Sequence, residues 1–251
     1  MTAAVIVQAR MTSTRLPGKV LLPLGDKTVL DHVLERCRAI RNADVVCCAI
    51  PEGAQSAPLL DVIERSGAVV FQGSEADVLD RYYQAARSVG ADFILRVTSD
   101  CPMADPEICA RVLDLVSGGG ADFACNNMPP SWPHGLDCEA VTFAWLERAA
   151  HEAAKQFERE HVMPWIRNHP EVIKANLVGP ANGIQDNRWT IDDASDYAFL
   201  KAMWDRLPAG AAGWPYEVPL AIVADEPSLA TINAGHDRLE GLKKSMREDK
   251  E

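Results

Sequence analysis

The sequence predicts an α/β fold built on a doubly wound, mostly parallel β-sheet. Short apolar runs, beginning at residues 3–7, alternate with segments in which apolar residues recur at helical spacing, beginning at residues 28–40. Of the 251 residues, 47% are hydrophobic and 24% are charged, a composition that suits one domain with a large core. Strands that alternate with helices pair in parallel, because each helix carries the chain back across the sheet.

Four strand–helix pairs account for the first half of the chain. Gly67, Gly90 and Gly118 each end a helix, and Asp105 followed by Pro106 begins one. The predicted strands are residues 3–7, 44–50, 68–71 and 92–97. The predicted helices are residues 28–40, 59–65 and 105–118, together with a long helix that ends at Gly90 and has Ser74 and Asp77 as its capping pair.

The second half is less regular and predicts a small α+β insertion. Proline and polar residues interrupt the pattern at residues 126–134, and Pro164 is expected to kink a helix. From Pro227 onward the helical periodicity is weak. The predicted strands are residues 122–125, 136–142 and 172–178, and the predicted helices are residues 143–154, 158–168 and 193–207.

Three cations follow the first predicted strand within one loop: Arg10, Arg15 and Lys19. Three hydroxyl side chains, among them Ser13, and a Pro-Gly corner lie in the same loop. Cations and backbone N–H groups at the end of a buried strand form a good receptor for a triphosphate. The loop is neither a Walker A loop nor a G-x-G-x-x-G fingerprint. The structural alternative is a surface loop whose cations are solvated.

Two aspartates stand where a divalent cation could bind. Asp100 follows the predicted strand 92–97 and precedes Cys101 and Pro102, so it lies outside a helix interior. A carboxylate at that strand end, facing a triphosphate loop, is well placed to hold Mg²⁺. Asp192 directly precedes the predicted helix 193–207. For both residues, capping a turn or a helix start is the structural alternative.

Charge and cysteine content argue against several classes of protein. The net charge of −11 argues against a nucleic-acid partner or binding to an anionic membrane, although local cations can still bind an anionic ligand. No apolar run approaches the roughly 20 residues that span a bilayer, and we expect no signal peptide. Seven cysteines without a C-x-x-C pair favour a reducing, cytoplasmic location.

Five segments, in order along the chain, resemble the sugar-acid cytidylyltransferases, which include the CMP-ketodeoxyoctonate and CMP-acylneuraminate synthetases. Within this group the chain is most similar to the spore-coat polysaccharide biosynthesis protein F family. The segments are residues 5–20, 73–82 (GSEADVLDRY), 96–102 (RVTSDCP), 158–162 (EREHV) and 188–192 (RWTID). The resemblance implies a Rossmann-like fold of the nucleotide-diphospho-sugar transferase type. It also implies transfer of CMP from CTP to a sugar, expected to be a sugar acid, for surface polysaccharide, with release of pyrophosphate.

The resemblance also implies how Mg²⁺ is held. In the related synthetases, two aspartates of a Gly-Asp-x-Pro and a Val-Asp-Thr-Pro motif bind the metal, and they match Asp100 and Asp192. Ser99 replaces the usual glycine and Asp193-Ala194 replaces Thr-Pro, so the loop geometry could differ while both carboxylates are kept. Lys19, Arg15 and Asp100 are the expected catalytic residues, because nucleotidyl transfer needs positioning and charge stabilisation.

The expected ligand contacts fall in two groups. The first is a set of nucleotide-binding residues near the predicted strand ends: Ala9, Arg10, Ser13, Arg15, Lys19, Ala49, Thr98 and Ser99. The second is a set of acceptor-binding residues in the second half: Asn126, His134, Asp137, Glu139, Arg159, His161 and Arg188. Arg159 or Arg188 could grip a substrate carboxylate through two hydrogen bonds, whereas structural salt bridges and a packing histidine are the alternatives for Arg159 and His161.

These expectations describe one nucleotidyltransferase domain over residues 1–251. Residues 1–120 form its nucleotide-binding half, residues 121–207 bind the acceptor and support the homodimer that family relatives often form, and residues 208–251 are an extension. Two other functions stay open: a glycosyltransferase that uses a nucleotide-sugar donor, and a non-catalytic nucleotide-binding protein. The chain contains no Asp-x-Asp, the metal motif that such glycosyltransferases often carry after a strand.

Overall fold

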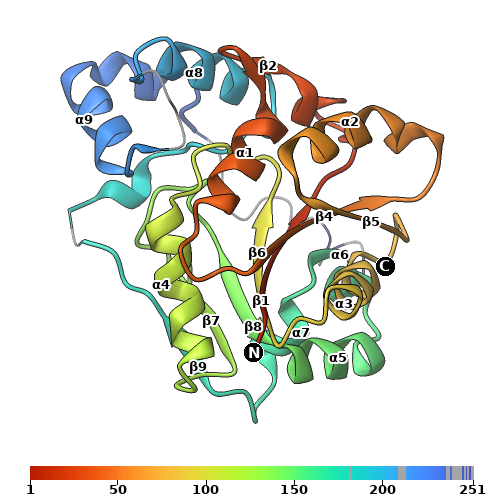
Figure 1. The fold of residues 1–251 in the computed structure, drawn as a ribbon. Coiled ribbons are helices and arrows are strands. Elements are labelled where there is room, and N and C mark those ends of the chain that lie inside the picture. Colours follow the sequence, from red (N-terminus) through yellow and green to blue (C-terminus); the bar gives the residue numbers. More distant parts are fainter. Residues whose placement is uncertain are drawn as a thin grey trace.

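The computed structural model describes residues 1–180, 182–208 and 213–235, together with residues 238, 245, 247 and 249. At its centre is a seven-stranded sheet with the order β5-β4-β1-β6-β8-β7-β9 (Figure 1). The strands are β1 (Ala3–Gln8), β4 (Val45–Pro51), β5 (Val69–Gly73), β6 (Phe93–Thr98), β7 (Phe123–Cys125), β8 (Glu139–Thr142) and β9 (Lys174–Asn176). Neighbouring strands are parallel except at β8, which runs antiparallel to both β6 and β7. The predicted α/β class and mostly parallel sheet are confirmed.

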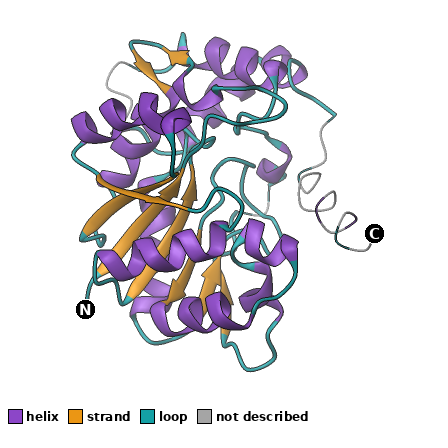
Figure 2. Ribbon diagram, turned by 90° about the vertical axis from the view of Figure 1, so that its right-hand side faces the viewer, coloured by secondary structure: helices purple, strands orange, loops and turns teal. Residues whose placement is uncertain are grey.

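Helices cover both faces of the sheet (Figures 1 and 2). One face packs against α1 (Val29–Arg38), α2 (Ala57–Ser66), α4 (Pro106–Ser117) and α8 (Ala194–Trp204). The other packs against α3 (Val78–Ser88), α5 (Phe143–Glu152) and α7 (Pro164–Asn168), and α6 (Gln156–His161) packs against α3 and α7. Along β1, Val5 and Val7 enter the first core while Ala4 and Ile6 enter the second. Burial on both faces explains why this strand reads as a continuous apolar run.

Side-chain caps begin several of these helices where the sequence predicts them. Asp105 accepts hydrogen bonds from the backbone N–H groups of Glu107 and Ile108 and so starts α4, with Pro106 in the first turn. The N–H of Asp77 donates to Ser74 Oγ at 3.0 Å, as the predicted capping pair requires, but the cap of α3 is Asp77 itself, which accepts from the N–H of Asp80. These caps fix the angle at which each helix leaves the sheet edge, and therefore the loops that surround the site.

The predicted helix over residues 158–168 is wrong in one respect, because it breaks into α6 and α7. The break is a γ-turn centred on the buried Val162, which has φ 71° and ψ −58°, and the N–H of Met163 donates to the carbonyl of His161 at 2.8 Å. Pro164 does not kink a helix but occupies the first position of α7, where its missing N–H is harmless.

Three further short elements complete the fold. A hairpin of β2 (Pro23–Leu24) and β3 (Lys27–Thr28) turns at Gly25. Helix α9 (Glu217–Asp225) was not predicted, and Pro219 is tolerated there because it lies in the first turn. A 3₁₀ helix, η5 (Pro227–Thr231), follows it and packs against α8.

Candidate active site

The carboxyl ends of β1, β4 and β6 meet at one edge of the sheet. Because β1 lies between the other two strands, Gln8 pairs with Ala49 on one side and with Thr98 on the other. The N–H of Ala9 donates to the carbonyl of Ala49 at 3.3 Å, and the N–H of Ser99 donates to that of Gln8 at 3.2 Å. The structure therefore gathers these predicted nucleotide-binding residues at the edge where parallel α/β sheets bind ligands.

Lys19 lies at the centre of this edge. It starts a short 3₁₀ helix, η1 (Lys19–Leu21), directly after Gly18, whose φ of 70° lets the chain turn there. Its Nζ donates to Asp100 Oδ2 at 2.7 Å, to Asp192 Oδ1 at 3.2 Å and to the carbonyl of Ile191 at 2.5 Å. The structure thus brings together the basic loop and both predicted metal ligands, which are 81 and 173 residues from Lys19 in the sequence.

The charges of this cluster stabilise one another. Burial of the Lys19 ammonium lowers its pKa, but Asp100 and Asp192 outweigh that effect and the pKa is raised. Burial likewise raises the pKa of the Asp100 carboxyl, but its attraction to Lys19 outweighs this and holds the pKa far below the usual range. Both groups are therefore charged at neutral pH.

Asp192 contacts three cations at once. Its Oδ1 faces Lys19 and lies 3.0 Å from Arg15 Nη2, and its Oδ2 lies 2.9 Å from Arg188 Nη2. The N–H of Ile191 donates to the carbonyl of Asp100 at 2.9 Å, which ties the two aspartate-bearing segments together. Asp100 and Asp192 therefore face one small volume, which Lys19 Nζ shares.

Arg188 connects this cluster to the predicted acceptor residue His134. Arg188 Nη1 lies 3.0 Å from His134 Nδ1, and because arginine can only donate, Nδ1 is the unprotonated nitrogen of a neutral imidazole. Burial lowers the pKa of His134, which is consistent with that neutral form. Arg188 Nε and Nη2 also donate to the two carboxylate oxygens of Asp196, at 2.8 and 2.7 Å. Desolvation would lower the pKa of Arg188, but Asp196 and Asp192 raise it instead.

A second polar cluster lies beside the first, on β6 and β8. Glu139 is buried between Arg96, whose Nη1 lies at 2.7 Å, and Arg167. Burial raises the pKa of Glu139, but the two guanidinium groups outweigh it and lower the pKa. Arg96 Nη2 also donates to Gln8 Oε1 at 3.2 Å. Arg96 was not among the predicted site residues, although an arginine inside the apolar strand 92–97 was a signal for it.

The other predicted residues are more widely spread. Arg10 is exposed and Ser13 is half-buried in the loop after β1. Asn126 is fully buried and links the carbonyl of Leu136 to the N–H of Cys138, an arrangement that closes a loop. Asp137 accepts from Gly135 N–H and from Arg238 Nη2.

Two of the predicted acceptor residues are engaged by other parts of the chain. Arg159 pairs with Asp77, the cap of α3, at 2.6 Å and also donates to the carbonyls of Ala150 and Ala153. His161 Nε2 lies 3.0 Å from Ser245 Oγ, and burial lowers its pKa. These contacts match the structural alternatives considered for both residues.

Asp100 and Asp192 fit a small divalent cation. Both carboxylates reach the same ammonium nitrogen, so Lys19 Nζ marks a position that a cation can share between them. Within the described residues, no group of three or more histidine, cysteine, aspartate or glutamate side chains could hold a metal. Two carboxylates suit Mg²⁺, which completes its octahedron with waters and substrate phosphates.

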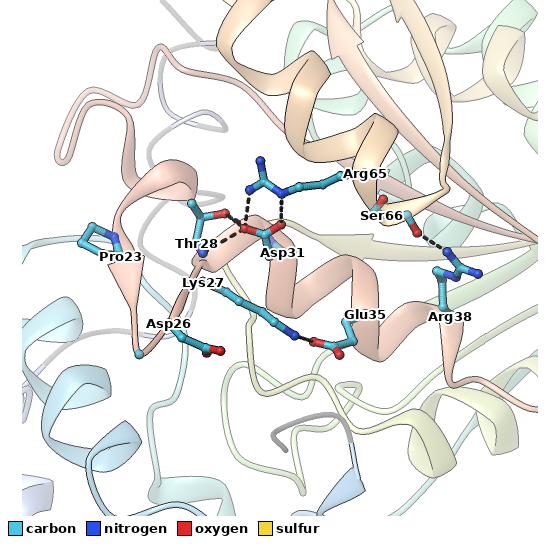
Figure 3. A pocket seen from close by; sticks show the side chains of 10 residues that line it. Pro23, Asp26, Lys27, Thr28, Asp31, Glu35, Arg38, Arg65 and Ser66 are labelled. Atoms are coloured by element: carbon cyan, nitrogen blue, oxygen red, sulfur yellow. Dashed lines mark hydrogen bonds and ion pairs between the residues drawn. The ribbon is translucent and has the colours of Figure 1, made fainter. Parts of the chain in front are cut away.

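A cavity of about 740 Å³ lies away from this edge, between the β2–β3 hairpin, α1 and α2 (Figure 3). Its charged side chains pair with one another: Lys27 with Glu35 at 2.8 Å, and Arg65 with Asp31 at 2.7 Å. Its lining residues include no member of the Lys19 cluster. The candidate active site is therefore the sheet edge and not this cavity.

The family profile described as cytidylyltransferase matches residues 4–202. This chain belongs to the cytidylyltransferase family. It is 32% identical to the spore coat polysaccharide biosynthesis protein SpsF of Bacillus subtilis over 80% of this chain and 85% of that protein. It is 31% identical to a 3-deoxy-manno-octulosonate cytidylyltransferase of Anaeromyxobacter over 46% of this chain and 48% of that enzyme.

A solved cytidylyltransferase structure from Leptospira borgpetersenii superposes with a TM-score of 0.87 at 29% identity, covering 94% of this chain and all of that one. The predicted resemblance is confirmed, and so is the fold type. As a member of this family, the chain is a nucleotidyltransferase. Within its described residues, the cytidylyltransferase has no helix that is both long and apolar enough to cross a membrane.

Proposed function

We propose that this cytidylyltransferase transfers CMP from CTP to a hydroxyl group of a sugar acid and releases pyrophosphate. The observation that carries the proposal is the meeting of Lys19 and Arg15 with Asp100 and Asp192 at the carboxyl edge of the sheet. Cations and paired carboxylates at one point suit a reaction between a triphosphate and a neutral nucleophile. The relative from Bacillus subtilis supports a role in building surface polysaccharide.

In the proposed reaction, the oxygen of the acceptor hydroxyl attacks the α-phosphorus, and the hydroxyl proton passes to solvent water. The bond between that phosphorus and the oxygen bridging to the β-phosphate breaks, and pyrophosphate leaves with the electron pair. Lys19 and Arg15 stabilise the negative charge that develops on the phosphate oxygens. Asp100 and Asp192 would hold Mg²⁺, which supplies further charge neutralisation when it is bound.

Nucleotide and acceptor would approach from different sides of this cluster. The backbone of Ala9, Ala49 and Thr98, at the ends of three adjacent strands, would contact the nucleoside. The acceptor would bind in the half formed by residues 121–207. There, Arg188 and the Arg96–Glu139–Arg167 cluster, which carries more positive than negative charge, would receive a carboxylate.

We further propose a cytoplasmic homodimer formed through the second half of the chain. All seven cysteines are unpaired and buried, which suits a reducing compartment. Trp145 and Trp165 are only half-buried on neighbouring helices, so they are candidates for the contact between subunits. The third tryptophan of that region, Trp132, is buried within the chain.

The test is to incubate the protein with Mg²⁺, each of the four nucleoside triphosphates and a panel of sugar acids, and to measure pyrophosphate. We expect release that needs both CTP and one acceptor, with a CMP-sugar as the second product. Sugar transfer from a nucleotide-sugar without pyrophosphate would instead identify a glycosyltransferase. Binding of CTP with no product under any acceptor would support a non-catalytic role.

A further inference from the structure

The carboxylate of Asp196 is fully buried beneath the active site, in the first turn of α8. Its Oδ1 accepts from Arg188 Nε at 2.8 Å, and its Oδ2 accepts from Arg188 Nη2 at 2.7 Å and from the backbone N–H of Asp192 at 2.9 Å. Asp196 therefore fixes Asp192 in two ways, through the backbone and through the arginine that contacts the Asp192 carboxylate. Among the described residues, the hydrogen-bond partners of its carboxylate include neither Lys19 nor Asp100.

Asn233 completes this arrangement from the C-terminal segment. Its side chain is only 5% exposed, and its Nδ2 donates both to Asp196 Oδ1 at 2.9 Å and to the carbonyl of Arg188 at 3.0 Å. The segment that carries it is held in place by Leu229, which is buried in the core beside α8. Asn233 lies 31 positions beyond residue 202, where the match to the family profile ends.

Packing alone does not require a buried amide at position 233. Asn233 Nδ2 donates to Asp196 and to the backbone of Arg188, and both of these residues hold Asp192 in place. A segment that served only to cover α8 could bury an apolar side chain at this position at less desolvation cost. Here one N–H of Asn233 donates to the carboxylate of Asp196, and the other donates to the backbone carbonyl of Arg188, four residues before Asp192. Groups that orient a ligating carboxylate in this way commonly set metal affinity.

We propose that Asn233 is a positioning residue for Asp192, so that the C-terminal segment forms part of the catalytic centre. Asn233 orients Asp196, and Asp196 holds the Asp192 carboxylate toward Asp100. This inference rests on the proposed function, because it takes Asp192 to share a divalent cation with Asp100. It assigns to residues 227–233 a role that the cytidylyltransferase reaction itself does not require of them.

The test compares Asn233→Ala with the wild-type chain in a titration of Mn²⁺ in the presence of CTP and without any acceptor, so that no turnover occurs. Free Mn²⁺ is followed by electron paramagnetic resonance, and folding is followed by the thermal midpoint. We expect about tenfold weaker Mn²⁺ binding in Asn233→Ala, the lower end of the effect seen when an outer ligand support is lost. Thr231→Val is the matched control, because the Thr231 hydroxyl donates to the carbonyl of Ser228 within the same segment.

A second variant, Asn233→Asp, keeps the volume of the side chain and replaces its donor with an oxygen that faces Asp196. We expect Mn²⁺ binding at least as weak as in Asn233→Ala. A folded variant at position 233 whose Mn²⁺ affinity stays within twofold of the wild type overturns the proposal, even if its thermal midpoint falls. A wild-type chain that binds no Mn²⁺ with CTP contradicts the proposed function itself, which separates the two failures.

Discussion

At the scale of single residues, Lys19 Nζ lies between the two carboxylates that are proposed to hold a divalent cation. Its Nζ lies 2.7 Å from Asp100 and 3.2 Å from Asp192, so its positive charge offsets the repulsion between two half-buried carboxylates. The same oxygens would have to bind a divalent cation, and Lys19 would have to turn to the phosphates. Nucleotide binding and metal binding are therefore expected to depend on one another.

Replacing Lys19 should impair the chemistry far more than the fold. For Lys19→Met we expect kcat/KM for CTP to fall by about 10²–10³-fold, the usual effect of losing one preorganised donor on a transition state. The rate is measured as pyrophosphate release with saturating acceptor. Lys27→Met is the matched control, since Lys27 pairs with the exposed Glu35 beside the cavity of Figure 3. If kcat/KM for CTP falls by less than tenfold in Lys19→Met, Lys19 is not a catalytic residue.

The same substitution should have the opposite effect on metal binding without nucleotide. In the wild type, the Lys19 ammonium competes with a divalent cation for Asp100 and Asp192, so we expect Mn²⁺ to bind weakly until CTP is added. Removing one positive charge from between the carboxylates should tighten Mn²⁺ binding to the nucleotide-free chain by about tenfold. Calorimetric titration of Mn²⁺ into both proteins measures this. Equal affinities would show that Lys19 does not occupy the metal position.

At the scale of elements, the γ-turn between α6 and α7 is a local conflict that tertiary packing overrides. Valine strongly disfavours positive φ, yet Val162 adopts φ 71° while its side chain is buried in the second core. Such a conformation costs about 1–3 kcal/mol. The turn ends α6 directly after His161 and begins α7, which carries Arg167 toward Glu139.

This strain predicts an unusual response to glycine. Val162→Gly and Val172→Gly remove the same buried side chain from the same core, but only position 162 has positive φ. We expect the loss of unfolding free energy to be smaller at position 162 by about 1–2 kcal/mol, because glycine relieves the strain there. Urea denaturation of both variants gives the comparison. An equal or greater loss at position 162 would mean that the turn is not strained.

Helix α8 depends on the buried charge in its first turn. Burial raises the pKa of Asp196, but hydrogen bonds from Arg188 and Asn233 outweigh it, so the pKa is lowered in the folded state. A lowered folded pKa stabilises the protein above the unfolded value, near 4, and this stabilisation is lost as the pH falls below it. Removing one partner of a buried pair costs about 3–5 kcal/mol.

For Asp196→Asn we therefore expect a lower unfolding free energy at pH 7 and a shallower dependence on pH. The wild type should lose stability as the pH falls below about 4, whereas the variant has no carboxylate to protonate at this position. Denaturant unfolding at pH 7 and at several values below pH 4 measures both effects. Parallel curves for the two proteins in the acid range would contradict the account of Asp196.

At the scale of the whole molecule, the sequence predicts the sheet and the meeting of its loops. The central strands β1 and β4 are buried on both faces, so their apolar runs can be recognised in the sequence, and the carboxyl ends of parallel strands meet at one edge of the sheet. This is why Lys19 and Asp100 could be placed on one edge from sequence spacing. The position of Asp192 came from family resemblance and agrees with the contacts that the structure shows.

The rest of the site could not be predicted because its contacts come from segments with no local signal. Asn233 follows a short 3₁₀ helix with weak periodicity, and its partner Asp196 is 37 residues away. Arg159 and Asp77 are 82 residues apart, and nothing near either residue indicates the other. The break at Val162 contradicts the local preference of valine, so only the completed packing shows it.

Two half-buried tryptophans offer a surface on which two chains could assemble. Trp145 on α5 and Trp165 on α7 lie 6.3 Å apart, and His169 stacks near both, so the two helices present one half-buried aromatic surface. If this surface joins two subunits, sedimentation equilibrium should give twice the 27.4 kDa chain mass, and Trp165→Glu should give the single chain. Val69→Glu is the control and should leave the dimer intact, because Val69 is exposed on the edge strand β5 and is not part of this aromatic surface. A monomeric wild type would contradict the dimer itself. A dimer that persists in Trp165→Glu with native circular dichroism would show that the subunits meet at another surface.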